Sequence, residues 1–440
     1  MTKRKNRWLY LFGGLTLLLV SCVRTEADLF DESAALRINR AVASAKDLLV
    51  SSENGWAMEY FPTNEQAGVT FLIRFDTNET ATVATVNEYV TAYTERSGSW
   101  DVIADTGPVL TFNTYIDIFH LYSDPSSGYG QGLGVGLEGD YEFIIMNQTD
   151  DWVQLKGKKR GTEIILKRLD KNQDWKAYFD KLSEVNAAMF HANLSLALNL
   201  SIGDKVYALT DGFTHVFTAA SLAPSENAEA ADADFKIPFI VTLSGIRLAK
   251  ALELDDRSIQ TFQLSGDKSC LYEVNDSDVK ITASVPPVRV FADETEWQKG
   301  INWYFDNNRL GGAFVSAYAN LVAGCAAVYK EDFQFFYFKY RADRRSLTLS
   351  FKSGTSKVYE GAYDFDISLK SEANSELEFI HKGTMDKNGE LYANHIPGFK
   401  EWFDLLTGST YVVTTDTPLA PSVLKFTSTS QPDNMFILIL

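Results

Sequence analysis

The amino-acid sequence predicts a mainly β protein with a few helices, a β-rich α+β fold, and three observations support this. Aromatic residues make up 13% of the 440 residues, with 29 Phe and 20 Tyr, and these residue types favour strands. Short segments that alternate apolar and polar residues recur along the chain, which is typical of half-buried strands. Clusters of Asp, Asn, Thr and Gln separate several of these segments, as hairpin turns do.

The first 21 residues have the composition of a lipoprotein signal peptide. Four basic residues lie within 3–7, and an apolar stretch follows over 8–20. This stretch is shorter than the roughly 20 residues that span a bilayer, which indicates a cleavable leader. The leader ends in a sequence that resembles a bacterial lipobox, made of Leu19, Val20, Ser21 and Cys22. The alternative is a plain secretory leader in which the cysteine is incidental.

The lipobox predicts a covalent lipid on Cys22 as the only prosthetic group. The thiol accepts a diacylglycerol, and a peptidase then cuts before the cysteine, where the small Ser21 fits the scissile bond. Each buried methylene of an acyl chain such as palmitate contributes roughly 0.8 kcal/mol, so two or more chains anchor a protein durably. We therefore expect a lipid-anchored protein of the cell envelope, held to the outer membrane with its facing side undetermined.

Beyond the leader, the sequence predicts a tether and two larger regions. Residues 22–32 form an acidic tether, and 33–169 form a helix followed by an antiparallel β-domain. Residues 170–440 form a second β-rich region with helices, which is subdivided near 286–292 by Pro286 and Pro287.

The first region begins with a helix over 33–50, whose apolar residues recur at steps of three and four. Eight short strands follow, at 56–60, 69–75, 80–86, 98–103, 109–114, 142–146, 152–155 and 163–166. Strands at this spacing predict an antiparallel meander, either a closed, lipocalin-like barrel or a sandwich.

The second region is less regular. A helix is predicted over 174–189, and a helical pattern over 293–323 is interrupted by Gly311 and Gly312. Its predicted strands lie at 193–199, 205–209, 214–219, 236–247, 260–264, 333–340, 346–351 and 435–440. Between them, 386–390 contains an Asn-Gly pair that predicts a hairpin turn in preference to a calcium loop.

The charge of the chain argues against a nucleic-acid partner. The full chain carries a net charge of −17, and removal of the leader leaves 37 basic and 58 acidic residues, which is −21. Phosphate backbones require concentrated Lys and Arg, and this composition offers the opposite. We therefore expect no binding to nucleic acid, and contact with a membrane only through the lipid.

Three stretches resemble a family of lipoproteins of unknown function from Bacteroidota. They are 107–115, 139–143 and 155–159. Members of that family tend to be encoded beside SusC/SusD-type outer-membrane importers. The resemblance therefore implies an accessory role at such an importer. It implies no catalytic residues, and the stretches themselves have the glycine turns and alternation of a sheet.

The chemistry-bearing residues form no recognisable motif. The five histidines lie far apart in the sequence, at His120, His191, His215, His381 and His395. Without His-Glu-x-x-His or Cys-x-x-Cys spacing we expect no metal site, and without a nucleophile elbow we assign no catalytic residues. Cys270 and Cys325 either pair in the oxidising envelope or remain buried thiols, and the second is favoured.

Two further features have competing interpretations. Glycine at every second position of 128–136 lacks the helix and lysine of a phosphate-binding loop, so a mobile hairpin loop or a bulged edge is favoured. A flexible lid over a barrel mouth is the remaining alternative. The tryptophans either stack on sugars or, as we expect for most of them, fill cores; those considered are Trp56, Trp100, Trp152, Trp297, Trp303 and Trp402.

Three functions remain open from the sequence, and the ligand stays unknown. The favoured one is a non-catalytic binding accessory that captures a peptide or glycan nutrient for an outer-membrane importer. The second is a surface hydrolase whose paired carboxylates meet only in the folded protein, because their spacing is set in space. The third is a structural or adhesive surface protein.

Overall fold

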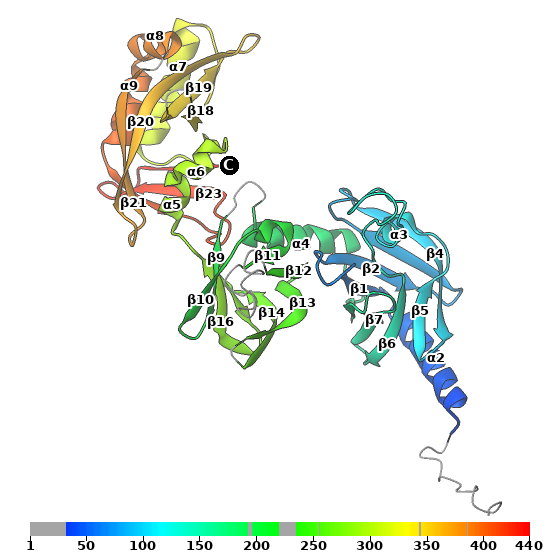
Figure 1. Cartoon of the computed structure of the whole chain (residues 1–440). Coiled ribbons are helices and arrows are strands. Elements are labelled where there is room, and N and C mark those ends of the chain that lie inside the picture. The colour runs from blue at the N-terminus through cyan, green and yellow to red at the C-terminus, as the bar shows by residue number, and fades with distance from the viewer. Residues whose placement is uncertain (1–31, 192–195, 220–234, 255, 343–344, 385) are drawn as a thin grey trace, which may run out of the picture.

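The structure is a computed structural model that describes residues 32–191, 196–219, 235–254, 256–342, 345–384 and 386–440. Within these residues the protein is mainly β, as the sequence predicts, with three eight-stranded antiparallel sheets in chain order (Figure 1). The middle sheet lies between the first and the third. The leader and the lipobox fall outside the described residues.

The first sheet is a closed barrel whose strands pair in sequence order, which decides between the barrel and the sandwich. The strands are β1 (Trp56–Tyr60), β2 (Val69–Phe75), β3 (Thr80–Thr85), β4 (Thr94–Ala104), β5 (Pro108–Phe112), β6 (Glu142–Gln148), β7 (Trp152–Gly157) and β8 (Glu163–Arg168). Helix α2 (Ala34–Val50) packs against β2, β4 and β5, and the Trp56 indole donates to the Leu49 carbonyl at 2.9 Å.

Aromatic side chains fill the interior of this barrel. The short helix α3 (Asp117–His120) places Phe119 inside, with ring centroids 4.6 Å from Phe112 and 5.0 Å from Phe71. Tyr60 and Phe143 complete the cluster, and all five rings are almost fully buried. Burial of so much aromatic area stabilises the barrel. The centre of the barrel is therefore a packed core, not a lipocalin-like ligand chamber.

The second sheet follows helix α4 (Trp175–Met189) and is almost closed. Its strands are β9 (Leu198–Ile202), β10 (Lys205–Leu209), β11 (Val216–Thr218), β12 (Lys236–Thr242), β13 (Gly245–Leu254), β14 (Arg257–Leu264), β15 (Cys270–Glu273) and β16 (Asp276–Ala283), with a 3₁₀ turn η1 (Gly212–Thr214) between β10 and β11. The edge strands β10 and β11 meet through reciprocal backbone hydrogen bonds between Thr210 and Thr218.

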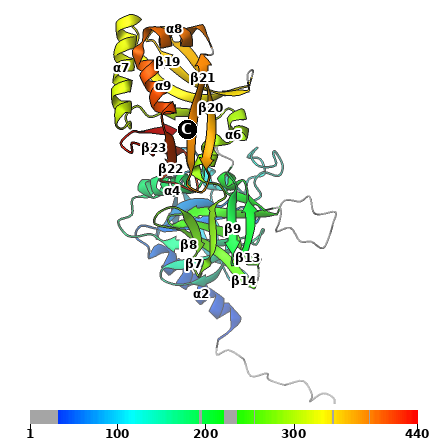
Figure 2. The same ribbon diagram turned by 90° about the vertical axis from the view of Figure 1, so that its left-hand side faces the viewer.

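The third sheet is a second closed barrel, covered by helices at one end (Figure 2). It comprises β17 (Trp303–Phe305), β18 (Phe333–Arg341), β19 (Ser346–Ser353), β20 (Tyr359–Ser371), β21 (Glu376–Thr384), β22 (Thr410–Thr414), β23 (Val423–Ser428) and β24 (Met435–Ile439). The helices of this part are α5 (Pro287–Ala292), α6 (Glu294–Gln298), α7 (Ala313–Val328), α8 (Lys387–His395) and α9 (Pro397–Thr407). Helix α9 buries Phe399, Trp402 and Leu406 against the barrel core.

The strands and the first helix of the first region match the sequence prediction closely, although the short helix α3 was not predicted. Three predictions for the second region are wrong. Residues 236–247 form not one strand but β12, a turn at 243–244 and the start of β13. The pattern over 293–323 contains the strand β17 between two helices. Residues 386–390 begin helix α8, because the Asp386 carboxylate caps it by accepting from the Gly389 N–H at 2.7 Å.

Helix α4 joins the first barrel to the middle sheet. Asp174 caps its start, and the adjoining side chains Tyr178 and Phe179 pack against the outside of the first barrel. Val185 and Met189, from its C-terminal half, belong to the core of the middle sheet. The helix therefore fixes how these two sheets face one another.

Candidate functional site

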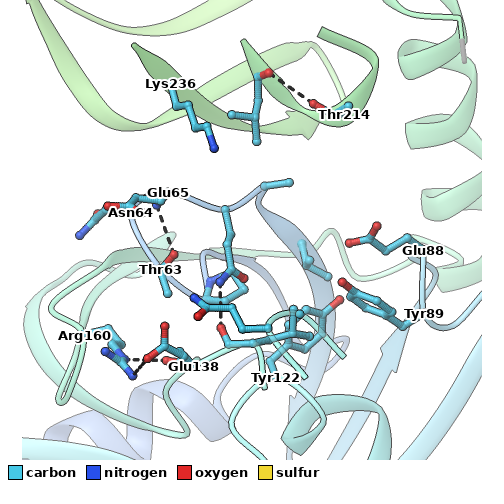
Figure 3. Close-up of a pocket in the computed structure, with 18 of the residues that line it drawn as sticks. Thr63, Asn64, Glu65, Glu88, Tyr89, Tyr122, Glu138, Arg160, Thr214 and Lys236 are labelled. Atoms are coloured by element: carbon cyan, nitrogen blue, oxygen red, sulfur yellow. Dashed lines mark hydrogen bonds and ion pairs between the residues drawn. The ribbon is translucent and has the colours of Figure 1, made fainter. Parts of the chain in front are cut away.

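A cavity of about 690 Å³ lies between the mouth of the first barrel and the middle sheet (Figure 3). The barrel contributes the loops around 62–67, 88–89, 130–131 and 137–138. The middle sheet contributes Thr214, Val216, Lys236 and Lys250. We call this space the larger compartment. Its volume is within the range of natural small-molecule sites.

A buried ion pair holds the two walls in place. Arg247 on β13 donates to the carboxylate of Glu59 on β1, and both residues are only 5% exposed. Lys167 on β8 forms a second ion pair with Glu59. Burial alone would raise the pKa of Glu59, but the two cations outweigh it and hold that pKa below its usual range. This cluster connects the first barrel to the middle sheet, because the two cations stabilise the buried Glu59 carboxylate.

Beside this ion pair the backbone of the first barrel contacts that of the middle sheet, at Gly68, where a side chain would not fit. The Gly68 N–H donates to the Phe239 carbonyl at 3.0 Å. A Cβ on Gly68 would lie 2.5 Å from the Cβ of Ile240 and 2.7 Å from the Phe61 ring. Phe61, Ile240 and Ala249 form a small apolar cluster at the same junction. The larger compartment therefore opens beside a tightly packed joint.

The stretches 139–143 and 155–159 do not line the compartment, but each lies directly beside a lining residue in the chain, Glu138 or Arg160. The carboxylate of Asp140 accepts from the backbone N–H groups of Lys159 at 3.0 Å and Arg160 at 2.8 Å. The Tyr60 hydroxyl donates to the Asp140 carbonyl at 3.0 Å. Burial raises the pKa of Asp140, although these N–H donors oppose the shift. The role of these stretches is structural: they set the position of Arg160, which forms an ion pair with Glu138.

The two walls of the larger compartment carry opposite unpaired charges. Lys236 extends from the middle sheet towards the loop that carries Glu65 (Figure 3). Lys250 lies on the same wall as Lys236, and Glu88 lies on the barrel wall. Within the described part of the chain, neither lysine has an ion-pair or hydrogen-bond partner. The compartment can therefore accept a ligand with both an anionic and a cationic group.

Three tyrosines lie in contact at the barrel side of the compartment. The Tyr89 ring centroid is 5.9 Å from that of Tyr122 and 4.6 Å from that of Tyr129. Partial burial, together with the adjacent Glu88, raises the pKa of Tyr89 to about 12, so its hydroxyl keeps its proton. Tyr129 belongs to the glycine-rich loop and is 43% exposed. Tyr89 and Tyr122 line the compartment, and Tyr122 is almost fully buried. Tyr89 therefore offers the compartment an aromatic face together with a hydroxyl group.

The Tyr122 hydroxyl is buried, and among the described residues it has no hydrogen-bond partner. Tyr122→Phe is expected to leave the free energy of unfolding unchanged or to raise it by up to about 1 kcal/mol, because an unsatisfied polar atom is removed. Tyr60→Phe is the matched control and should lower it by about 1 kcal/mol, because that hydroxyl has a partner. Urea denaturation measures both; equal losses would mean that the Tyr122 hydroxyl is bonded.

A smaller compartment of about 290 Å³ adjoins the larger one beside α4. The two share Ala67, Val69, Glu88 and Thr214. The apolar side chains that line the smaller compartment are Val86, Phe179, Leu182, Phe213, Ile240 and Val241. The cleft thus combines a charged chamber with an apolar one.

His215 lies in the smaller compartment, where its Nε2 is 2.9 Å from the Asn186 amide oxygen. Burial lowers the pKa of this histidine to about 4. In the unfolded chain the pKa of this histidine is near 6.5, so the unfolded chain binds the proton more readily than the folded protein does. The folded protein therefore has its full stability above about pH 6.5 and loses stability as the pH falls towards 4. We expect acid destabilisation of about 3 kcal/mol across that window.

His215→Asn should flatten the pH dependence between pH 6.5 and 4, because asparagine does not titrate. Asparagine also tolerates the left-handed backbone at this position, where φ is 59°. Urea midpoints at several pH values measure the effect. An unchanged slope in the variant would mean that another group accounts for the acid loss.

The sequence-predicted site residues are distributed as follows. Leu19, Val20, Ser21 and Cys22 lie outside the described residues, so lipid attachment stays a prediction. The glycine-rich 128–136 segment is a loop in which five glycines have positive φ, and Gly130 and Gln131 line the larger compartment. The segment is therefore a loop, and both its motion and a role as a lid stay predictions.

The histidines, cysteines and tryptophans are mostly structural. The histidines remain scattered, and the described part of the chain contains no group of three or more His, Cys, Asp or Glu side chains able to hold a metal ion. Cys270 and Cys325 are both free thiols, but only Cys325 is buried, and Cys270 is half-exposed, so the prediction of two buried thiols is wrong for Cys270. The tryptophans fill cores except Trp152, which is 38% exposed; the buried ones are Trp56, Trp100, Trp297, Trp303 and Trp402.

Comparisons with known proteins identify a family. Residues 26–266, more than half of the chain, match a family model described as a domain of unknown function (DUF4302). The chain belongs to this family. Every residue that lines either compartment lies inside the matched range, so the cleft is part of the DUF4302 region. No curated protein matches the sequence.

Matches to solved structures are distant. One is transferrin-binding protein B of Haemophilus parasuis, at 10% identity and a TM-score of 0.14, with 85% of this chain and 66% of that protein covered. The chain therefore spans just under two thirds of its length. Kievitone hydratase of Nectria haematococca matches at 8% identity and a TM-score of 0.11, with 90% and 91% covered. Matches at these TM-scores carry no argument about fold or function.

The sequence did not single out the lysines, glutamates and tyrosines of the cleft. Lys236 and Lys250 come from strands of the middle sheet, while Glu65 and Glu88 come from loops of the first barrel. No local motif connects them.

The described residues contain no helix with the length and hydropathy needed to cross a membrane.

Proposed function

We propose that this protein is a lipid-anchored binding protein of the cell envelope that captures a nutrient, a peptide or a glycan, for an outer-membrane importer. The observation that carries the proposal is the cleft between the first barrel and the middle sheet. It combines a preformed cavity of about 690 Å³, unpaired charges on opposite walls and the aromatic ring of Tyr89. A rigid cavity with a few polar groups that point inwards is the usual form of a small-molecule site.

Two rigid contacts make the cleft a preformed site. The buried Arg247–Glu59 pair and the shared helix α4 fix the separation of its walls. A ligand then gains affinity because little conformational freedom is lost when it binds.

The lipobox supports the anchoring part of the proposal. Cys22 lies twelve residues before Ala34, the first residue of α2. A fully extended tether of that length spans at most roughly 40 Å. Helix α2 and the third barrel lie at opposite ends of the molecule (Figures 1 and 2). An anchor at Cys22 would therefore hold the first barrel and its cleft near the membrane, with the third barrel farther away.

A retention experiment tests the binding function. The purified protein is incubated with a casein digest or with a mixture of plant oligosaccharides, and retained molecules are identified by mass spectrometry. We expect saturable retention of one class, with the ligand recovered unchanged. Retention of neither class would contradict the binding function. Formation of product would replace it with the hydrolase, and Glu65→Gln and Glu88→Gln would then test the cleft carboxylates.

A pair of variants in the glycine-rich loop places the binding in the cleft. Gln131 lines the larger compartment, whereas Leu133 is 80% exposed and lines neither compartment. Gln131→Trp is expected to weaken retention by steric blockage, and Leu133→Trp is expected to leave it unchanged. Equal retention by both variants would place the ligand elsewhere.

The importer is tested by purification from native outer membranes. A SusC/SusD-type pair should purify with this protein in stoichiometric amounts after mild detergent extraction. Its absence would leave a binding protein without the accessory role.

A further inference from the structure

The two compartments of the cleft differ in chemistry in a way that selects a class of ligand. The larger one presents Lys236 and Lys250 on the middle-sheet wall and Glu65 and Glu88 on the barrel wall. The smaller one is lined mainly by apolar side chains. Because four lining residues belong to both compartments, a single molecule can occupy both at once.

The opposed charges favour a ligand that carries both signs. The protein as a whole has a net charge of −17, so two unpaired lysines on one wall of a cavity form a local exception. An anionic group of a ligand would be attracted to Lys236 and Lys250. A cationic group would be attracted to Glu65 and Glu88 on the barrel wall, across the cavity from Lys236 (Figure 3). Charge-assisted hydrogen bonds of this kind are stronger than neutral ones.

The apolar compartment favours a ligand with a hydrophobic side chain. Phe179 and Leu182 of α4 form one side of it, and Ile240 and Val241 of β12 form the other. Its volume of about 290 Å³ suits one bulky apolar side chain. Glu88 is shared by both compartments, so the cationic group of the ligand would lie near this side chain.

We infer that the cleft binds a short peptide with free termini, whose carboxylate lies against the lysine wall and whose bulky apolar side chain fills the smaller compartment. This inference rests on the proposed function and selects between its two nutrient classes. A neutral glycan has neither the paired charges nor an apolar side chain, so it would leave both features of the cleft unused.

Binding of defined tetrapeptides tests the inference. Calorimetry compares a phenylalanine-containing peptide with free termini, the same peptide with both termini blocked, the same peptide with aspartate in place of phenylalanine, and maltotetraose. Blocking the termini is expected to weaken binding roughly tenfold or more, because charged hydrogen bonds are lost. Aspartate is expected to weaken it by a similar factor, because burial of an aromatic side chain is lost.

Matched variants assign the two parts of the ligand to the two compartments. Ser183→Trp, on the exposed edge of the smaller compartment, is expected to remove the preference for phenylalanine, while Glu184→Trp, one residue away and outside both compartments, should keep it. Lys236→Glu is expected to weaken the free peptide roughly tenfold but not the blocked one, since reversal of one charge removes a charge-assisted contact. Lys280→Glu, on an exposed site outside the cleft, should change neither.

The outcomes separate the inference from the proposed function. Binding of maltotetraose, weakened by Gln131→Trp, with no binding of peptides would keep the cleft as a ligand site and overturn the peptide assignment. Equal affinity for free and blocked peptides would overturn the role of the opposed charges. Failure of a mixed tetrapeptide library and of the oligosaccharides alike would overturn both.

Discussion

Arg247→Ala is expected to lower the free energy of unfolding by about 3–5 kcal/mol, because it leaves the buried Glu59 carboxylate without its main partner. The loss should weaken the contact between the first barrel and the middle sheet. Glu59 is 5% exposed, and Lys167 alone remains beside it. A lower urea midpoint measures the loss. Faster amide exchange at Gly68 would locate it, because that N–H crosses the joint to Phe239.

Two comparisons control this prediction. Arg257→Ala removes a partly exposed ion pair with Asp276 on the middle sheet and should cost no more than about 1 kcal/mol. The double variant Glu59→Met/Arg247→Met should be less destabilised than Arg247→Ala, because no buried charge is left unpaired. Equal losses for Arg247→Ala and Arg257→Ala would show that the Glu59 cluster does not hold the two sheets together.

Cys22→Ala is expected to release most of the protein from the membrane fraction and to leave its leader uncleaved by the lipoprotein peptidase. The prediction rests on the lipobox, Leu19 to Cys22. Loss of two or more acyl chains removes an anchor worth roughly 0.8 kcal/mol per methylene. Membrane fractionation and labelling with radioactive palmitate measure both effects.

Cys325→Ala is a suitable control, because that thiol is buried in the third barrel and far along the chain from the leader. It should keep the label and the membrane association. If Cys22→Ala were processed and fractionated like the unchanged protein, the lipid anchor would be wrong.

Local patterns were sufficient to predict most of the first barrel. Its strands alternate inward and outward residues, as in β7, where Val153 and Leu155 are buried between exposed or half-buried neighbours. The start of the helix predicted over 174–189 and the break at Pro286 are also determined within a few residues. Such features are determined by nearby sequence, so sequence reasoning finds them.

The three wrong predictions for the second region arise where the local sequence pattern is ambiguous. The turn at Leu243 and Ser244, before Gly245, lies within a mainly apolar stretch, so the pattern over 236–247 predicts a single strand. The strand Trp303–Phe305 has only three residues, which is too few to show the alternation of a strand within the helical pattern around it. The residue types at 386–390 are compatible with a hairpin turn or with a helix cap. The hydrogen bond from the Gly389 N–H to the Asp386 carboxylate, which the sequence does not reveal, makes this segment a helix cap.

The cleft was beyond sequence reasoning because its parts are distant in the chain. Glu65 and Lys236 line one cavity only after two separate sheets have folded and packed. The contacts that pack them, such as Glu59 with Arg247, are 188 residues apart. A lysine on a strand is ordinarily a solvated surface residue, and nothing near Lys236 in the sequence marks it as different.

Lysine footprinting tests the central claim, that the space between the first barrel and the middle sheet is the ligand site. The purified protein is acetylated at a limiting rate, with and without a saturating amount of the retained ligand, and each lysine is quantified by mass spectrometry. We predict slower labelling of Lys236 and Lys250 and an unchanged rate at Lys280, which lies on the same sheet outside the cleft. Unchanged rates at Lys236 and Lys250 under saturation would contradict the claim.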